Sequence, residues 1–498
     1  MLELPSDGQT FSQIRENNLL YVDKTKFLYP IIKKPGCYFL SRPRRFGKSM
    51  LLDTLRELLK GKRDLFKDLW IDQSDYDFKP YPVITLSMAG LGHGEEKLEQ
   101  DLINRLNVEA INHGLEPLDD FSPGGLLKRM VTTLNQKTKE RVAILVDEYE
   151  APIQEVINDL NLAQIHRQVL LTFYLSIKAL ADSNKTHLVY VTGETKFTQT
   201  SFFSGFNNLN DLTLNPNFNA ACGFTLEEFE TYFTLYLPDV LKFNQSEGFM
   251  SATASLEDQK KDIIDYYDGY CWDGENRILN PFSLIKMLDR KLLKPYWFET
   301  ATPSFLMELL KHGVSEFEFP VNPTMTTYDL NSVDFLNLEA NVLLFQTGYL
   351  TVDKMIKPDE YLLRRPNKEV SEAIDSNLLN FLLGQTRQTV NQLIERLQKA
   401  LEKLDSISLG ACFHDILVWN SHMALKASEG SGQAVILSVL QATHFNVVSE
   451  GIQAEGLINF LITTRKDTVF VCEFKSEKLE PKPKFPREKS KRLKYKDK

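Results

Sequence analysis

Along the first 215 residues, short apolar runs alternate with longer segments whose apolar residues recur at helical spacing. The runs at 37–41, 83–87, 141–146 and 187–192 are almost wholly apolar and predict buried strands. The segments 48–60, 95–112 and 164–181 lie between or beside these runs and predict helices with one apolar face. Strands separated by helices predict a parallel α/β sheet with helices on both faces.

Beyond about residue 215 the pattern becomes mainly helical, with predicted helices at 225–236, 256–267, 281–292 and 304–311 and a small β-element at 342–352. Two strands are predicted near the end, at 456–463 and 468–474. The last residues are rich in Lys, Glu and Pro and predict disorder. The pattern therefore predicts an α/β domain, a helical domain, a small α/β unit and a tail, with these bounds: 1–215, 216–384, 385–475 and 476–498.

Composition narrows the class of protein. With 43% hydrophobic and 25% charged residues, the 498-residue chain can bury large cores, and its net charge of -9 disfavours nucleic acid as a general partner. The five cysteines are far apart and lack C-x-x-C spacing, which disfavours a zinc site or a disulfide framework. No signal-like start and no apolar run long enough for a membrane span is seen. A cytoplasmic protein without a membrane partner is expected; export into another cell by a specialised route stays open.

Residues 42–49 read RPRRFGKS between a predicted strand and a predicted helix, which is where a phosphate-binding P-loop belongs. Backbone N–H groups of the loop and the helix N-terminus would hold phosphate, Lys48 would neutralise it and Ser49 would bind Mg²⁺. Arg42 replaces the usual first glycine. The alternative is an ordinary basic helix start, which is physically poor because cations oppose the helix dipole there. The expected nucleotide-binding residues are the loop itself: Arg42, Pro43, Arg44, Arg45, Phe46, Gly47, Lys48 and Ser49.

A pair of acids, Asp147 and Glu148, ends the third predicted strand. At the carboxyl edge of a parallel sheet, Asp147 would hold Mg²⁺ and Glu148 would act as a general base toward water. Thr192 ends the next strand and is a candidate for contact with the terminal phosphate or the attacking water, and Lys196 follows it and could add positive charge. The alternative for each is an ordinary solvated strand end.

Several further motifs accompany the loop and the acids. They are YVDKT at 21–25, DEYEAP at 147–152, YDGY at 267–270, NPF at 280–282 and QTGY at 346–349. In this combination the chain resembles the bacterial AAA-ATPase-like family. The resemblance implies ATP and Mg²⁺ as cofactors, with an Arg in place of the first loop glycine. It implies Lys48 and Ser49 as the phosphate and Mg²⁺ residues and Asp147 and Glu148 as the paired acids.

The same resemblance implies a C-terminal module similar to the PD-(D/E)XK nucleases. Glu429 lies where the helix acid of that module belongs, and Glu473 and Lys475 form a Glu-x-Lys at the end of a strand. Asn459, however, stands where the metal-binding Asp belongs. Because an amide supplies no negative charge to a divalent cation, the module is expected to be degenerate and inactive.

Three functions remain open from the sequence. The favoured one is an ATPase that acts as a switch or motor on an unknown protein client. The alternative is an ATP-regulated protein that processes nucleic acid with an active metal-dependent nuclease domain. A third is a binding module whose ATP site only maintains its shape. Arg141, Arg167 and Arg277 are candidates for an arginine finger, and the sequence does not distinguish them.

Overall fold

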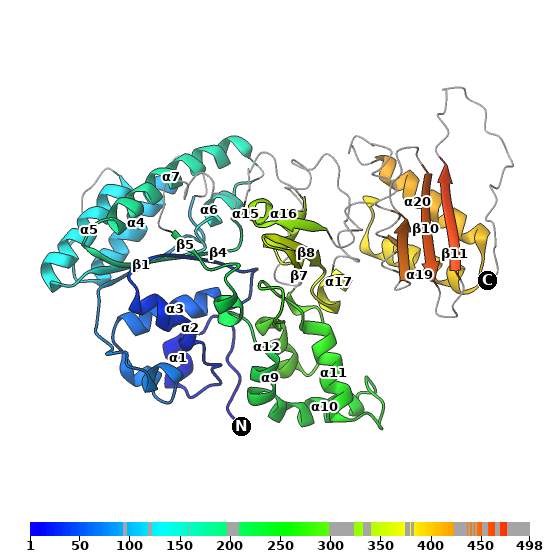
Figure 1. Cartoon of the computed structure of the whole chain (residues 1–498), viewed down its shortest axis with the longest axis horizontal. Helices are drawn as coiled ribbons and strands as arrows, with labels where there is room; N and C mark the ends of the chain where they lie inside the picture. The colour runs from blue at the N-terminus through cyan, green and yellow to red at the C-terminus, as the bar shows by residue number, and fades with distance from the viewer. Residues whose placement is uncertain are drawn as a thin grey trace. The chain divides into compact units, whose positions relative to one another are not determined.

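A five-stranded parallel sheet is the centre of the chain's first half in the computed structural model (Figure 1). The strands lie in the order β2-β3-β4-β1-β5, so β4 is inserted between β1 and β3. Their bounds are β1 Gly36–Ser41, β2 Val83–Ser87, β3 Val142–Asp147, β4 Thr186–Gly193 and β5 Leu209–Asp211. This sheet confirms the predicted parallel α/β fold.

The structure describes most of the chain. The described residues are 1–92, 97–117, 122–157, 159–196, 209–297, 323–331, 340–373, 379, 383–422, 436, 439–440, 443, 446–450, 457–463 and 469–475. The predicted helix at 304–311 and the predicted disordered tail at 476–498 lie outside them.

The register brings the carboxyl ends of four strands to one edge. Ser41 pairs with Gly193 across β1 and β4, and Ser87 pairs with Asp147 across β2 and β3. Ligands of open parallel sheets bind outside the carboxyl ends of the strands. A ligand site is therefore expected at this edge.

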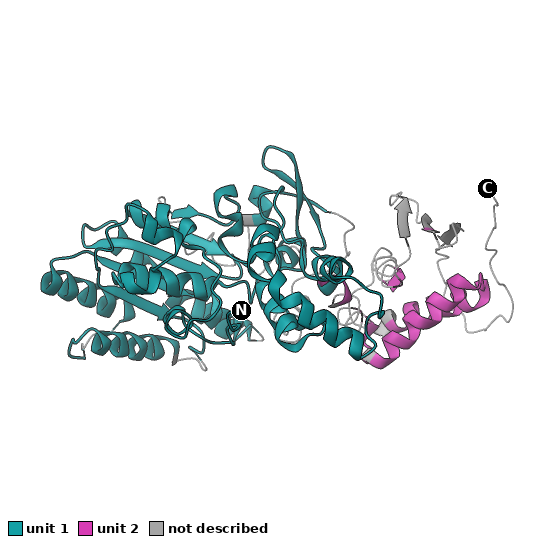
Figure 2. Cartoon of the chain, turned by 90° about the horizontal axis from the view of Figure 1, so that it is seen from below, with its two compact units in different colours: residues 1–313, 322–369 teal, residues 314–321, 370–498 magenta. Residues whose placement is uncertain are grey.

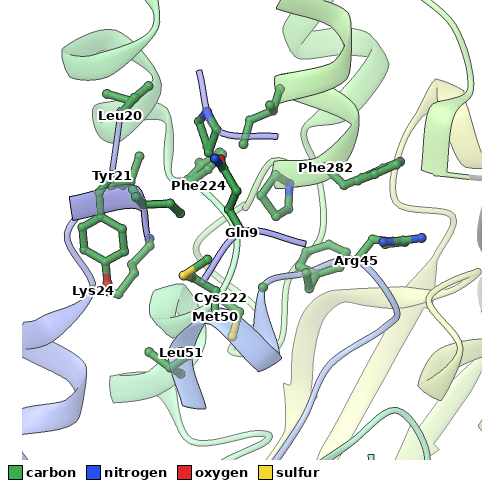
Figure 3. A pocket seen from close by; sticks show the side chains of 18 of the residues that line it. Gln9, Leu20, Tyr21, Lys24, Arg45, Met50, Leu51, Cys222, Phe224 and Phe282 are labelled. Atoms are coloured by element: carbon green, nitrogen blue, oxygen red, sulfur yellow. The ribbon is translucent and has the colours of Figure 1, made fainter. Parts of the chain in front are cut away.

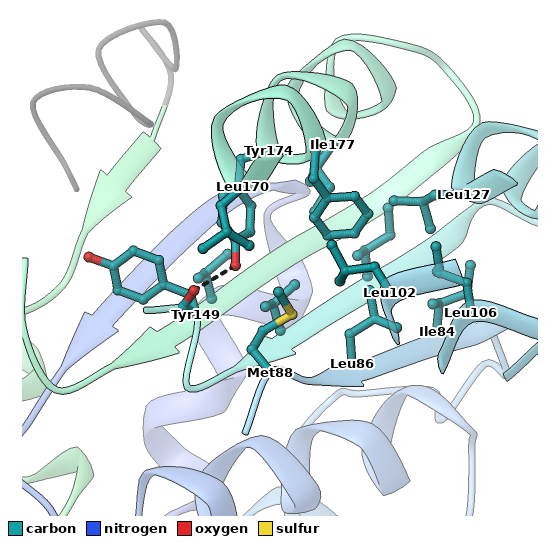
Figure 4. Close-up of a cluster of buried hydrophobic side chains, with 14 of the residues drawn as sticks. Ile84, Leu86, Met88, Leu102, Leu106, Leu127, Tyr149, Leu170, Tyr174 and Ile177 are labelled. Carbon is teal, nitrogen blue, oxygen red and sulfur yellow. Dashed lines mark hydrogen bonds between the residues drawn. The ribbon is translucent and has the colours of Figure 1, made fainter. Parts of the chain in front are cut away.

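Helices cover both faces of the sheet (Figure 1). One face carries α1 (Phe11–Glu16), α2 (Thr25–Lys33) and α3 (Lys48–Leu59), and the other carries α4 (Lys97–Asn112), α5 (Pro123–Thr138) and α7 (Leu160–Ala181). Figure 4 shows the apolar core between the sheet and the second group of helices, with Ile84 and Leu86 from β2 facing Leu102 from α4. The Tyr174 hydroxyl on α7 donates a hydrogen bond of 2.9 Å to the Tyr149 carbonyl, which ties α7 to the turn after β3.

Short capped helices follow the sheet. They are α9 (Leu226–Tyr232), α10 (Leu237–Ser246), α11 (Leu256–Tyr267) and α12 (Pro281–Arg290), with 3₁₀ turns at Pro216–Ala221 and Thr234–Tyr236. Ser255 begins α11 and Asn280 begins α12, each by accepting hydrogen bonds from backbone N–H groups of the first turn. The core of this part also contains Leu20 and Val22 from the N-terminal segment, so the chain's start packs against these helices.

A small antiparallel sheet follows, in the order β6-β8-β7. Its strands are β6 (Thr324–Thr326), β7 (Thr351–Lys357) and β8 (Glu360–Arg364), accompanied by α15 (Thr327–Asn331), α16 (Ala340–Gln346) and α17 (Lys368–Ala373). The β-element predicted at 342–352 is thus helical in its first half. Residues 342–345 form a continuous buried apolar run, and such a run has no period that separates a strand from a helix.

The chain divides into two compact units (Figure 2). The first holds residues 1–313 and 322–369, and the second holds 314–321 and 370–498. Within the second unit, α19 (Arg387–Glu402) and α20 (Ser406–His422) precede a three-stranded antiparallel sheet, β9 (Asn446–Glu450), β10 (Leu457–Thr463) and β11 (Val469–Lys475). The domain boundaries predicted at 215, 384 and 475 stay predictions.

Candidate functional site

The loop of residues 42–47 links β1 directly to α3. Gly47 precedes the helix with φ 91°, a left-handed conformation that favours glycine, and Arg45 is left-handed as well, with φ 65°. The backbone thus turns at both residues directly before α3 begins. Lys48 is the first helical residue, and Ser49 beside it is exposed.

The Lys48 ammonium group is buried but has no acidic partner among the described residues. It donates to the carbonyl oxygens of Arg42 and Pro43 at 2.9 and 3.0 Å, and 7% of the residue is exposed. Carbonyl oxygens supply no negative charge, and Glu148 interacts with Lys48 electrostatically without forming an ion pair with it. An anion bound in the loop would compensate the Lys48 charge.

Arg42, the first residue of the loop, stands in place of the usual glycine, and its side chain is buried. Its guanidinium donates to the carbonyl oxygens of Ser41, Thr213 and Phe218 at 2.8 to 2.9 Å, and it lies over the Trp272 ring with 4.1 Å to the ring centroid. Only 1% of the residue is exposed, and burial lowers its pKa to about 10, so it stays charged at neutral pH. The structure therefore gives Arg42 a supporting role and does not direct its guanidinium at a ligand.

Aromatic residues from the helical part hold the rest of the loop. Phe46 is fully buried and packs edge-on against Tyr270 and Trp272, with ring centroids 4.6 and 5.4 Å away. The Trp297 indole N–H donates to the Arg44 carbonyl at 3.0 Å. The aromatic-rich stretch before and including Trp272 thus serves to pack the loop.

The two acids end β3 beside this loop. Asp147 accepts a short hydrogen bond from the Thr192 hydroxyl, and β4 places that threonine between the strand of the loop and the strand of the acids. Glu148 has the left-handed φ of 53°, which is strained for a glutamate and typical of functional sites. Desolvation raises the pKa of Glu148 and the charge of Asp147 raises it further, although the side chain stays exposed.

Lys196 and Glu150 are buried close to the two acids, and the motifs do not predict their contacts. The Lys196 ammonium, 2% exposed, pairs with Asp211 at 2.7 Å, so its charge is already compensated inside the protein. Glu150 is 1% exposed, and burial raises its pKa to about 7. One of its oxygens accepts from the backbone N–H groups of Glu194 and Thr195. The sequence signal for Glu150 is its place two residues after Glu148 in the turn that follows β3.

A cavity of about 1010 Å³ opens over this edge of the sheet. Lys48 and Ser49 line it from the loop side, and Asp147 and Glu148 line it from β3. Glu194, which pairs with Arg44 at 2.6 Å, lies on its wall. The structure thus brings together the loop and both acids, which lie about 100 residues apart in the chain.

A second, smaller pocket of about 240 Å³ adjoins the loop (Figure 3). Its walls come from the N-terminal segment, the start of α3 and the residues around Cys222 and Phe282. Leu20, Met50, Phe224 and Phe282 make it largely apolar. It is close enough to share Arg45 and Gly47 with the larger cavity.

Comparison with known proteins identifies the family. The model of the family described as "Predicted AAA-ATPase" matches residues 5–203, the region that holds the loop and the paired acids. The "Uncharacterized protein in vnfD 5'region" of Azotobacter chroococcum mcd 1 is 32% identical over 499 residues, which span 96% of this chain and 90% of that protein. The chain belongs to the AAA-ATPase-like family.

A solved structure, "Structure of Drosophila ORC bound to GC-rich DNA and Cdc6", is 9% identical and covers 54% of this chain and 89% of that chain, with a TM-score of 0.23. A TM-score this low supports no argument about fold or function. The family itself supports an ATP-binding ATPase, and ATPases of this kind ordinarily use Mg²⁺. No described helix of this AAA-ATPase-like protein is long and apolar enough to cross a membrane.

The predicted nuclease-like residues are only partly described. Glu429 lies outside the described residues, and for Asn459, Glu473 and Lys475 the backbone alone is described. The register of β10 and β11 pairs Asn459 with Glu473. Among the residues that the structure describes, no group of three or more His, Cys, Asp and Glu is arranged to hold a metal ion.

Replacing the buried arginine beneath the loop should destabilise this AAA-ATPase-like protein. Arg42→Ala leaves three carbonyl acceptors without their charged donor and empties space against Trp272. We expect the free energy of unfolding to fall by about 3 kcal/mol. Urea unfolding would measure this, with the exposed Arg63→Ala as the control. A loss no larger than that of the control would contradict the supporting role of Arg42.

Proposed function

We propose that this chain binds ATP with Mg²⁺ at the loop of residues 42–49 and hydrolyses it. The observation that carries the proposal is the buried Lys48, without an ion pair among the described residues, on one wall of a cavity whose other wall holds Asp147 and Glu148. A cation, a helix N-terminus and two carboxylates around one cavity suit a polyphosphate together with a divalent metal ion. The family supports the same chemistry.

The residues present fit both groups. The N–H groups at the start of α3 would hold phosphate oxygens, and a Cβ on Gly47 would meet no neighbour within 4 Å, so the loop faces open space there. The Ser49 hydroxyl and the Asp147 carboxylate are oxygen ligands of the kind that Mg²⁺ prefers. When bound, Mg²⁺ would neutralise charge on the phosphates.

The smaller pocket fits the base of the nucleotide. It adjoins the loop, shares Arg45 and Gly47 with the larger cavity and is largely apolar, as planar aromatic ligands require. Its wall combines residues of the N-terminal segment with Phe224 and Phe282 from the helical part. A bound base would therefore contact both parts of the first unit.

Hydrolysis needs a group that takes a proton from water. Glu148 is exposed to the larger cavity, and its raised pKa brings it closer to neutral pH, where a general base is most effective. Thr192 holds Asp147 through its hydroxyl and so orients the metal-binding acid. In this proposal Thr192 acts as a positioning residue, and Lys196 stabilises the chain after β4 through Asp211.

Hydrolysis would serve a switch or motor because the loop is packed against the helical part. Phe46 contacts Tyr270 and Trp272, and Arg42 donates to Thr213 and Phe218. A change in the loop on nucleotide binding must therefore be accommodated by these neighbours. The client is proposed to be a protein, and nucleic acid is not favoured at a net charge of -9.

Lys48→Ala should abolish nucleotide binding because it removes the buried cation that phosphate would compensate. Titration of the full chain with a fluorescent ATP analogue and Mg²⁺ would measure the dissociation constant. Lys60→Ala, just beyond the other end of α3, is the matched control and should bind as the unchanged chain does. Equal affinity in a folded Lys48→Ala variant would refute the phosphate site.

Glu148→Gln should keep ATP bound while slowing its hydrolysis by about 10²–10⁴-fold, because the amide preserves shape and cannot accept the proton. Single-turnover release of phosphate would measure the rate. Glu140→Gln, an acid before the opposite end of β3, is the control. Turnover at the wild-type rate would show that Glu148 is not the base, and an unchanged chain that binds but never hydrolyses ATP would favour a shape-maintaining site.

We also propose that the C-terminal nuclease-like unit is inactive. The reason is the amide of Asn459 at the position of the metal-binding Asp, opposite Glu473 in the β10–β11 register. An amide adds no negative charge to the two acids, Glu429 and Glu473, that would hold a divalent cation. The alternative, a nucleic-acid-processing protein with an active nuclease, requires metal binding despite this loss.

The purified chain should therefore leave linear and supercoiled DNA intact in Mg²⁺ or Mn²⁺. Gel analysis of both substrates would test this, with Lys475→Ala as the control for any trace of cleavage. Cleavage that depends on metal and disappears in Lys475→Ala would establish the alternative function.

A further inference from the structure

Arg44 occupies the middle of the phosphate loop, but its charge is held by an acid from another strand. Its Nε donates to a Glu194 carboxylate oxygen at 2.6 Å, and a terminal nitrogen donates to the Gln154 side chain at 3.3 Å. Glu194 follows directly after β4, whose Thr192 contacts Asp147. Arg44, Lys48 and Glu148 all line the same cavity.

The two partners differ in freedom of movement. The Arg44 side chain is 43% exposed, whereas the Glu194 side chain is 11% exposed. The Glu194 backbone N–H is also fixed by the buried carboxylate of Glu150. Since the arginine is the long and exposed partner, it is the one that can leave.

A triphosphate is a stronger partner for Arg44 than one carboxylate. Guanidinium groups bind phosphate oxygens in a two-pronged geometry, and a nucleoside triphosphate carries several negative charges beside the loop. Arg44 also lines the same cavity as the proposed base, Glu148. It is therefore placed where the terminal phosphate would meet the attacking water.

Movement of Arg44 from Glu194 to a phosphate is reversible, because it leaves the Glu194 carboxylate without its cation. Glu194 lies near Glu150, whose pKa is raised to about 7 by burial and, to a lesser extent, by the charge of Glu194. Repulsion from the Glu150 carboxylate, which accepts from the Glu194 backbone N–H, favours the return of Arg44.

We propose that Arg44 dissociates from Glu194 and binds the terminal phosphate of a nucleoside triphosphate. Arg44 would thus act as an arginine finger within its own chain. This rests on the proposed ATP site. It gives Arg44 a role that Arg141 is not placed to take in its own chain, since Arg141 precedes β3 at the end opposite Asp147. Glu194 is the resting partner that keeps Arg44 from the site when no triphosphate is present.

The test is that two substitutions should change the preference for a triphosphate in opposite directions. The dissociation constants of a non-hydrolysable ATP analogue and of ADP, both with Mg²⁺, are measured on the full chain, and their ratio gives the preference for the triphosphate. Arg44→Ala should lower that preference about tenfold by removing the phosphate contact. Glu194→Gln should raise it about threefold, because it frees Arg44 from a partly exposed ion pair.

A purely structural ion pair would instead give changes of the same sign in both variants, or equal changes for both nucleotides, and either result would overturn the inference. Arg44→Gln replaces Arg44→Ala if the latter does not fold. Arg63→Ala and Asp72→Asn remove another Nε–carboxylate pair, 3.1 Å apart, remote from the cavity, and should leave the preference unchanged. If the unchanged chain bound neither nucleotide, the proposed function would fail together with this inference; binding with shifts of the same sign would overturn the inference alone.

Discussion

The buried Arg42 guanidinium is the interaction on which the arrangement of the site depends. It lies at the point where β1 becomes the loop of residues 42–47, and it donates to the carbonyl oxygens of Ser41, Thr213 and Phe218. Burying a charge is unfavourable unless hydrogen bonds satisfy it, and here carbonyl acceptors and the Trp272 ring do so. A glycine at this position could make none of these contacts. The loop is thereby fastened to the segment that leads from the sheet into the helices.

The chain after β4 forms a second connection between the same parts. Glu194 reaches the loop through Arg44, and the backbone N–H of Lys196 donates to the Gln346 side chain on α16 at 2.9 Å. The backbone N–H groups of Glu194 and Thr195, between these contacts, are held by the buried Glu150. The three consecutive residues 194–196 therefore contact the loop, the turn after β3 and the helix α16. Backbone hydrogen bonds restrain these three residues, so a displacement at one of their contacts is transmitted to the others.

The candidate residues of the site could be named from the sequence because their motifs are short, and the structure brings them around one cavity. Gly47, Lys48 and Ser49 are consecutive, and Asp147 and Glu148 end a strand whose apolar run is unmistakable. The parallel sheet followed from the same alternation of runs and stripes. The helix at 340–346 could not be predicted, because four consecutive buried apolar residues fit a strand equally well. The strand β5 has only three residues and gives no periodic signal.

The sequence by itself determined the parallel α/β fold and the candidate loop and acids, because period, apolar runs and loop glycines are properties of neighbouring residues. Only the tertiary structure decided which charged side chains pair with an opposite charge. Lys196 pairs with Asp211, and Arg44 pairs with Glu194. Arg42 and Lys48 are buried and donate to carbonyl oxygens. These partners lie up to about 176 positions apart in the chain. The reason is physical: the charge state and accessibility of an ionisable side chain depend on its neighbours in space, and strand order places those neighbours.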